Sequence, residues 1–197
     1  MKKSLVLLAL LPLSATLSGC LSFGAKPPAS LLTLTATAPA PIGQSETATP
    51  DHTLTVNVPA VPQELAVQRV PVQASDTSVA YVKDALWVEP PARLFARLVS
   101  DTITAKTDWV VLGNQQARVD PGTQLSGELR NFGVDAGTSE AVVTYDAALL
   151  RVGQTNVEKR RFEARVPIAA VEAGAVGVAI NQAANQVAGE IADWVGK

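Results

Sequence analysis

Apolar residues recur at helical spacing in two stretches of the chain. In residues 92–106 they form one stripe, and Arg93, Arg97 and Asp101 lie on the opposite face. Pro91 stands near the first helical position, where its missing amide hydrogen costs nothing. In residues 175–195 the apolar positions recur every three or four residues. The spacing therefore predicts two amphipathic helices, with these apolar positions: Leu94, Phe95, Leu98, Val99, Ile103, Val176, Ile180, Ala184, Val187, Ile191 and Trp194.

Alternating polar and apolar residues predict strands in the first half of the chain. Residues 53–58 place Leu54, Val56 and Val58 on one buried face. A second extended stretch follows at 65–72, where a proline indicates an edge or a bend. Residues 78–89 are typical of a hairpin, with its turn near Lys83 and Asp84. The short apolar run at 109–112 predicts one more buried strand.

Three longer strand candidates occupy the second half of the chain. They cover residues 123–134, 140–152 and 157–168, and the spacers between them have the composition of hairpin turns. In the last candidate, charged residues such as Arg161, Glu163 and Arg165 alternate with apolar ones. A charged outer face on an antiparallel strand indicates solvation in the first instance, with a binding patch as the less favoured alternative. Together the elements predict a mixed α/β fold, in which a sheet that is largely antiparallel in its C-terminal half packs with two main helices.

The second helix carries many small residues and a polar face. The small ones let the helix lie close against a sheet or another chain, and packing on its own sheet is the simpler interpretation; they are Ala179, Ala183, Ala184, Ala188 and Gly189. Asn181, Gln182, Asn185, Gln186 and Glu190 form the opposite, polar face.

The N-terminus has the pattern of a secretory signal. Two lysines precede an apolar run that is too short to span a membrane, and small residues then lead to Cys20. Residues 17–20, Leu-Ser-Gly-Cys, resemble a bacterial lipobox, which implies cleavage between Gly19 and Cys20 and acylation of the cysteine, for example with palmitate. Such a covalent lipid anchor on Cys20 would hold the mature chain on a membrane surface, because two acyl chains suffice for stable anchoring. An ordinary signal peptide with an incidental cysteine is the alternative.

Three segments follow from these patterns. Residues 1–19 are the predicted signal peptide, residues 20–51 a lipid-anchored flexible tether rich in proline, alanine and threonine, and residues 52–197 the folded domain. We expect the tether to be poorly ordered, although Ser30 to Leu34 is compatible with a short edge strand. Leu21 stands where an aspartate would retain a lipoprotein at the inner membrane. Resemblance to Gram-negative lipoproteins therefore favours the outer membrane, facing the periplasm.

Composition narrows the function classes. Removing Lys2 and Lys3 with the signal takes the formal charge from −2 to −4, so nucleic acid is a poor candidate partner. Cys20 is the only cysteine and His52 the only histidine, which excludes an internal disulfide and a metal site built on clusters of these residues. A Ser-His triad would have to use His52, which lies in a linker and is more simply a solvated residue. Phosphate-binding loops and nucleophile elbows are also absent, and we expect neither catalysis nor a cofactor.

One segment carries a specific resemblance. The motif Leu-x-Val-x-Val-Pro at 54–59, followed by Tyr81, the run Trp-x-Glu-Pro-Pro-Ala at 87–92 and the first helix, resembles the ABC-type transport auxiliary lipoproteins (the PqiC-like family). The similarity extends from about Leu31 to the final helix, and the Trp-x-Glu-Pro-Pro segment is its most specific part. Trp87, Glu89, Pro90 and Pro91 are thus the candidate partner site or structural turn, and the start of a helix is the favoured interpretation.

The resemblance implies an α/β lipoprotein that works beside an ABC permease and ATPase and a mammalian-cell-entry (MCE) domain protein. Such systems move phospholipid or other hydrophobic molecules between membranes. The expected role is docking: the anchor fixes one end of the path to the outer membrane, and the body contacts the MCE-domain protein or itself in an oligomer. Two alternatives stay open. One is a lipid carrier that encloses an acyl chain in an apolar cavity. The other is an envelope-assembly lipoprotein that shares only the fold.

Overall fold

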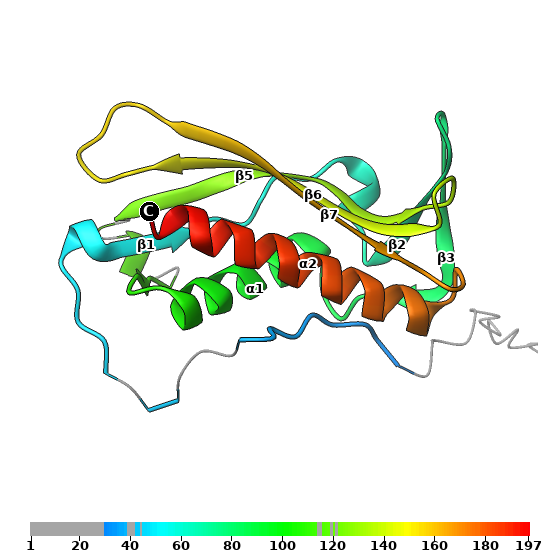
Figure 1. The fold of residues 1–197 in the computed structure, drawn as a ribbon, viewed down its shortest axis with the longest axis horizontal. Helices are drawn as coiled ribbons and strands as arrows, with labels where there is room; N and C mark the ends of the chain where they lie inside the picture. Colours follow the sequence, from blue (N-terminus) through cyan, green and yellow to red (C-terminus); the bar gives the residue numbers. More distant parts are fainter. Residues whose placement is uncertain (1–29, 39–41, 44, 114–115, 119, 121) are drawn as a thin grey trace, which may run out of the picture.

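The computed structural model describes residues 30–38, 42–43, 45–113, 116–118, 120 and 122–197. The predicted signal peptide, its cleavage position at Gly19 and the lipidation site Cys20 lie outside these residues. Seven strands form one mixed sheet, and two long helices cover one of its faces (Figure 1). The strands are β1 Thr53–Val56, β2 Arg69–Ser75, β3 Ser78–Leu86, β4 Val110–Val111, β5 Thr123–Asp135, β6 Glu140–Leu150 and β7 Glu158–Pro167. The helices are α1 Pro91–Lys106 and α2 Ala173–Val195, with short 3-10 turns η1 Pro50–His52, η2 Gln63–Leu65 and η3 Gln116–Arg118.

Strand β5 is the centre of the sheet. One of its edges pairs antiparallel with β6, which pairs in turn with β7. Its other edge pairs in parallel with two strands, β1 near its start and β2 near its end. Strands β4 and β3 complete the sheet beside β1 and β2. The fold class is therefore the predicted one, a mixed sheet with an antiparallel C-terminal half.

Both predicted helices are confirmed with their apolar faces. All five apolar residues predicted for α1 and all six predicted for α2 are buried. Ala183, Ala184 and Ala188 have no exposed surface, and α2 packs against α1, β3, β5, β6 and β7. The small side chains of α2 therefore serve the close approach of this helix to its own sheet and to α1.

The three long strands are also confirmed. Their observed bounds differ from the predicted ones by one or two residues. In β7 the buried residues Phe162, Ala164 and Val166 alternate with the exposed Arg161 and Arg165, as the sequence pattern predicts. Long strands of this kind carry enough alternation to fix both their register and their buried face.

The predicted hairpin at residues 78–89 is wrong. The chain turns earlier, at Asp76 and Thr77, and residues 78–86 form the single strand β3. Lys83 and Asp84 lie in a β-bulge, where Asp84 takes a positive φ of 57°. An aspartate tolerates this conformation better than most residues, so the same chemistry that is typical of a turn here serves a bulge.

Two predicted buried stretches are less buried than expected. Strand β1 ends at Val56, and Val58 is 54% exposed, although the chain bonds to β5 again at Ala60, which pairs with Glu128. The apolar run at 109–112 forms only the two-residue strand β4, which is half-buried. Strand β4 lies at the edge of the sheet, where one side of a strand has no neighbour to cover it.

The expected flexible tether is docked over part of its length. Residues 30–38, which we call the strap, run along the outer side of α2 (Figure 1). Leu32 pairs in parallel with Trp87, which matches the predicted short edge strand at one residue. The expectation of a poorly ordered tether is wrong for the strap, because the body supplies partners for its backbone.

Candidate functional site

Trp87, the first residue of the Trp-x-Glu-Pro-Pro segment, belongs to the core. Its side chain is 1% exposed, and its ring centroid lies 5.3 Å from that of Phe132 in β5. Phe95 and Tyr145 extend this aromatic cluster to α1 and β6. The indole Nε1 of Trp87 is buried and has no hydrogen-bond partner among the described residues. The packing of Trp87 among aromatic rings in the core therefore explains this residue by its contribution to folding.

The rest of the segment starts α1. Pro90 is the residue before the helix and Pro91 is its first residue, the position that a proline occupies without losing a hydrogen bond. The Glu89 carboxylate accepts a hydrogen bond from Arg97, which stands two turns into the helix. The contacts of Glu89, Pro90 and Pro91 thus fit the structural-turn interpretation, and a contact with a partner protein stays a prediction.

The strap binds α2 through asparagine side chains rather than through a strand. The amide of Thr35 donates to Asn181 Oδ1 at 2.9 Å, and the amide of Thr37 donates to Asn185 Oδ1 at 2.8 Å. Asn185 Nδ2 donates to the carbonyl of Thr35 at 2.9 Å. Because Asn181 and Asn185 are one helical turn apart, their amides lie on one face and meet successive polar groups of an extended chain.

Apolar contacts complete this strap site. Leu32, Leu34 and Ala36 are partly buried against the core, and the residues between them are exposed, which is the alternation of a strand. Gly177 makes room for Leu32, because a Cβ at this position would lie 2.7 Å from Leu32 Cδ2. The amide of Leu32 donates to the carbonyl of Leu86 at 2.7 Å, and the amide of Val88 donates to the carbonyl of Leu32 at 2.9 Å. The strap is therefore bound at both α2 and the end of β3.

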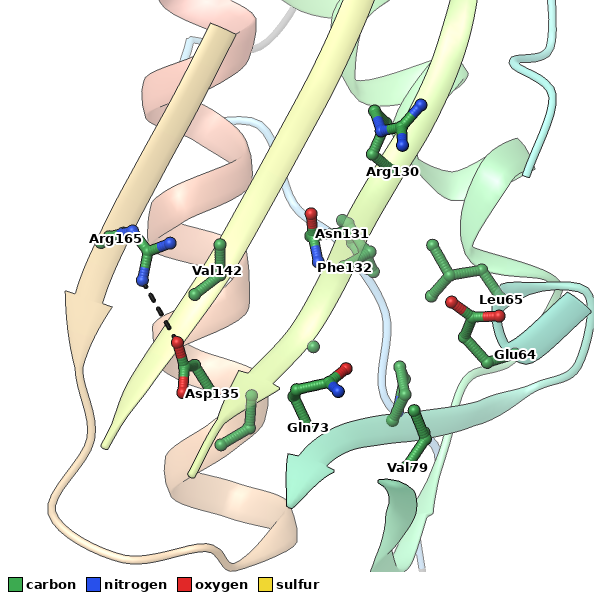
Figure 2. Close-up of a pocket in the computed structure, with 13 residues that line it drawn as sticks. Glu64, Leu65, Gln73, Val79, Arg130, Asn131, Phe132, Asp135, Val142 and Arg165 are labelled. Atoms are coloured by element: carbon green, nitrogen blue, oxygen red, sulfur yellow. Dashed lines mark hydrogen bonds and ion pairs between the residues drawn. The ribbon is translucent and has the colours of Figure 1, made fainter. Parts of the chain in front are cut away.

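The opposite, helix-free face of the sheet has a shallow hollow (Figure 2). It lies across β2, β5 and β6, and Gly133 lets β2 approach β5 because a Cβ there would collide with the carbonyl of Pro71. Its volume is about 90 Å³, well below the roughly 300–1,000 Å³ of pockets that enclose small-molecule ligands. Glu64, Arg130 and Arg165 supply charge at its rim. The hollow is large enough for a side chain of a partner but too small for an acyl chain.

Ion pairs cross the same face from strand to strand. Asp146 on β6 pairs with Arg161 on β7 at 2.6 Å and with Arg130 on β5 at 3.8 Å. Arg165 on β7 pairs with Glu163 at 2.8 Å, and with Asp135 and Glu140 at 3.4 Å each. Opposite charges on neighbouring strands stabilise a sheet modestly. The charged face that the sequence predicts is thus largely self-neutralised, which agrees with the solvation interpretation.

These ion pairs and nearby hydrogen bonds change the pKa values of several carboxyl groups. Hydrogen bonds from Arg161 lower the pKa of Asp146, and the hydrogen bond from Arg165 lowers the pKa of Glu163. For Asp135, partial burial opposes the change, but the amides of Thr138 and Gly137 together with Arg165 lower the pKa overall. On the helix face, burial raises the pKa of Asp101 despite the nearby Arg97. The Glu163 carboxylate also accepts a hydrogen bond from the Thr144 hydroxyl at 2.9 Å.

The described part of the chain contains no cluster of metal ligands, and its one histidine is exposed. No group of three or more histidine, cysteine, aspartate or glutamate side chains there could hold a metal ion. His52 lies exposed in η1, with its ring centroid 5.8 Å from that of Trp109. The solvated position predicted for His52 is therefore the observed one.

Sequence reasoning missed the strap site. It placed Asn181 and Asn185 on the polar face of the second helix and treated residues 20–51 as a flexible tether. The available signal was the combination of two asparagines at i, i+4 with a short alternating stretch from Leu32 to Ala36. Neither pattern alone distinguishes a docked segment from a free one.

The model of the family of ABC-type transport auxiliary lipoprotein components matches residues 32–192. This chain belongs to that family. The matched region begins at Leu32, in the strap, and ends in α2, so it includes most of the strap, every strand, α1 and most of α2. The family resemblance stated from the Trp-x-Glu-Pro-Pro segment is thereby confirmed, and it assigns the auxiliary lipoprotein to the cell envelope and to an ABC transport system.

Solved structures resemble the auxiliary lipoprotein in fold. A crystal structure of a Xanthomonas campestris protein is 20% identical, covers 84% of this chain and 94% of its own, and has a TM-score of 0.66. A second crystal structure, of an uncharacterised protein, is 19% identical, covers 84% and 99%, and has a TM-score of 0.63. No curated protein is significantly similar in sequence. Within the described residues, neither α1 nor α2 has the length and apolar character needed to cross a bilayer.

Proposed function

We propose that the auxiliary lipoprotein is a docking subunit, anchored to the outer membrane by acyl groups on Cys20 and facing the periplasm. It would hold the MCE-domain protein and the ABC permease and ATPase of a lipid transport system near the bilayer. The folded body would contact other proteins and would not catalyse a reaction. The proposal rests on the family assignment together with the lipobox-like residues at 17–20.

The packing between the helices and the sheet favours a docking role over a role as a lipid carrier. A carrier needs an apolar interior large enough for an acyl chain. Here the helix–sheet interface is filled by side chains without exposed surface, among them Ala184, Ile180 and Ile191 of α2. The small residues of α2 bring the backbone close to the sheet, which is the opposite of what a lipid cavity requires. This closed interface supports a role in binding other proteins.

Co-purification with the transport proteins tests the docking role. The acylated protein is extracted in mild detergent from cells that also produce the MCE-domain protein and the permease, and the purified material is analysed for protein and bound lipid. We expect the MCE-domain protein in stoichiometric amount and no retained phospholipid on the auxiliary lipoprotein alone. The Cys20→Ala variant should lose the membrane location and keep its fold.

Two outcomes would overturn the proposal. Recovery of phospholipid bound to the isolated auxiliary lipoprotein, without an MCE-domain partner, would identify a carrier. Recovery of neither would leave the envelope-assembly alternative as the better account. A variant of the exposed side of α2, Gln182→Ala, is a matched control because it changes a solvated residue of the body and leaves the anchor intact.

A further inference from the structure

The strap determines where the N-terminal chain leaves the body. The end of the strap near residue 30 lies beside the N-terminal end of α2, whereas the β6–β7 hairpin loop lies at the opposite end of the molecule (Figure 1). The contacts of Leu32 with Leu86, Val88 and Gly177 fix this exit point. A chain that was free up to η1 would instead leave the body near the start of β1.

Docking of the strap also shortens the distance that the chain can span. Between Cys20 and Leu32 a fully extended chain reaches at most about 40 Å. Between Cys20 and Thr53 the same limit is about 110 Å. The bound strap therefore keeps one particular end of the body close to whatever holds Cys20.

Three exposed apolar residues belong to the segments that meet at this exit point. Leu31 is 51% exposed and precedes Leu32, Val88 is 48% exposed and follows Trp87, and Val178 is 71% exposed and follows Gly177. Single exposed apolar residues are ordinary on protein surfaces. These three are distinguished by their position: Leu31 precedes Leu32, the Val88 amide donates to the Leu32 carbonyl, and Val178 follows Gly177, which makes room for Leu32. We call them the exit patch.

We propose that the strap orients the body, with the exit patch against the bilayer that holds the anchor. This inference rests on the proposed acylation of Cys20, and it adds which surface of the auxiliary lipoprotein faces lipid. The short reach supplies the proximity, and partition of Leu31, Val88 and Val178 into the headgroup region supplies a modest additional attraction. The opposite end, with the β6–β7 loop, then points away from the membrane and toward the other transport proteins.

Quenching of a fluorescent label by lipid tests this orientation. Acylation occupies the thiol of Cys20, the only cysteine, so a cysteine introduced by Val178→Cys or Val152→Cys is the only free thiol for labelling. Val152 is exposed in the β6–β7 loop and serves as the matched far-end position. The labelled proteins are bound to vesicles of phosphatidylethanolamine and phosphatidylglycerol that carry a nitroxide on the headgroup. We expect strong quenching of the label at position 178 and little at position 152.

Variants that release the strap test whether the bound strap, rather than the anchor alone, orients the body. Leu32→Ala with Asn181→Ala and Asn185→Ala removes the side chains that hold the strap on both sides of the exit point. The difference in quenching between the two positions should then disappear. Thr33→Ala with Gln182→Ala and Gln186→Ala is the control, because these exposed residues have matched positions on the strap and on α2. The control should keep the full difference. A difference that survives the triple variant with Leu32→Ala would overturn the role of the strap.

A second anchor separates this inference from the proposed acylation. The mature chain with Cys20→Ser and a hexahistidine at its N-terminus is bound to vesicles that contain nickel-chelating lipid. The same difference in quenching on these vesicles supports the orientation even if Cys20 proves unmodified in cells. Equal quenching at positions 178 and 152 on both kinds of vesicle would overturn the inference.

Discussion

Trp87 joins three parts of the molecule at a single residue. Its ring packs against Phe132 in the centre of the sheet, its amide donates to the carbonyl of Gln68 at 2.8 Å, and its backbone pairs with Leu32 of the strap. Its indole N–H is the one buried side-chain polar atom without a partner in the described part of the chain. A buried donor without a partner costs about 1–3 kcal/mol, which the surrounding aromatic packing has to offset.

Substitution of Trp87 tests this balance. Trp87→Ala should lower the free energy of unfolding by about 3–5 kcal/mol, since it leaves a cavity within the aromatic cluster. Trp87→Phe should cost clearly less, because it keeps an aromatic ring and removes the unpaired donor. Urea denaturation followed by circular dichroism measures both values. Equal losses for the two variants would contradict the account of Trp87.

The ion pairs of the open sheet face predict a dependence of stability on acid. Asp146 has a lowered pKa in the folded protein, so its contribution is complete above the pKa of the unfolded state, near 4. This contribution is lost as the pH falls through the lower folded-state value. Asp146→Asn should therefore lower the free energy of unfolding at neutral pH by up to about 1 kcal/mol, a small amount because the pair is exposed. The free energy of unfolding of this variant should also fall less steeply than that of the wild type as the pH is lowered.

Denaturation midpoints measured from pH 7 down to pH 2 test this prediction. Asp76→Asn is the matched control, because Asp76 is exposed at the β2–β3 turn and has no ion pair within the described residues. Its curve should run parallel to that of the wild type. An Asp146→Asn curve that is also parallel would show that the pair with Arg161 contributes nothing in solution.

The strap is the element whose stability is most separable from that of the body. A few hydrogen bonds and three partly buried apolar side chains hold it, whereas the sheet and helices share one continuous core. Segments with few buried contacts open without global unfolding. The strap should therefore detach and rebind while the body remains folded.

Gly177→Leu tests the separation of strap and body. The new side chain would occupy the space of Leu32 and displace it, while a better helix former at this position adds up to about 1 kcal/mol to helix α2. We expect faster hydrogen exchange at the amides of Thr35 and Thr37 without a loss of global stability. Gly174→Leu is the control, because a Cβ there meets no atom within 4 Å. Equal exchange rates in the two variants would show that Leu32 does not hold the strap.

Length and periodicity decide which elements the sequence predicts. Helices α1 and α2 and strands β5, β6 and β7 are long enough for their alternation to fix type, bounds and buried face. The turn at Lys83 and Asp84 was misplaced because an aspartate favours turns and bulges alike. The strap was missed because its partners are asparagine side chains far along the chain, and no local pattern reports a tertiary contact of that kind.

At the scale of the whole molecule, the two faces of the sheet differ in what they offer. One face is closed by helices and carries the strap. The other presents paired charges, a hollow of about 90 Å³ and a second, open hollow of about 600 Å³ lined by Asp146 and Arg161. The formal charge of −2 gives the chain no basic surplus, which is unfavourable for binding nucleic acid. The family could be predicted from the sequence because the Trp-x-Glu-Pro-Pro segment is specific. The surface that contacts a partner could not be predicted from the sequence, because the strand register decides which charges are paired with each other and which stay available.

The docking role that we propose requires acyl groups on Cys20 that hold the body at a membrane. The mass of the protein extracted from membranes tests it most directly, with fragmentation of the N-terminal peptide to locate any modification. We predict a chain that begins at Cys20 and carries diacylglyceryl and acyl groups on that residue, and a Cys20→Ala form that leaves the membrane. An unmodified Cys20, or an uncleaved chain that begins at Met1, would contradict the account.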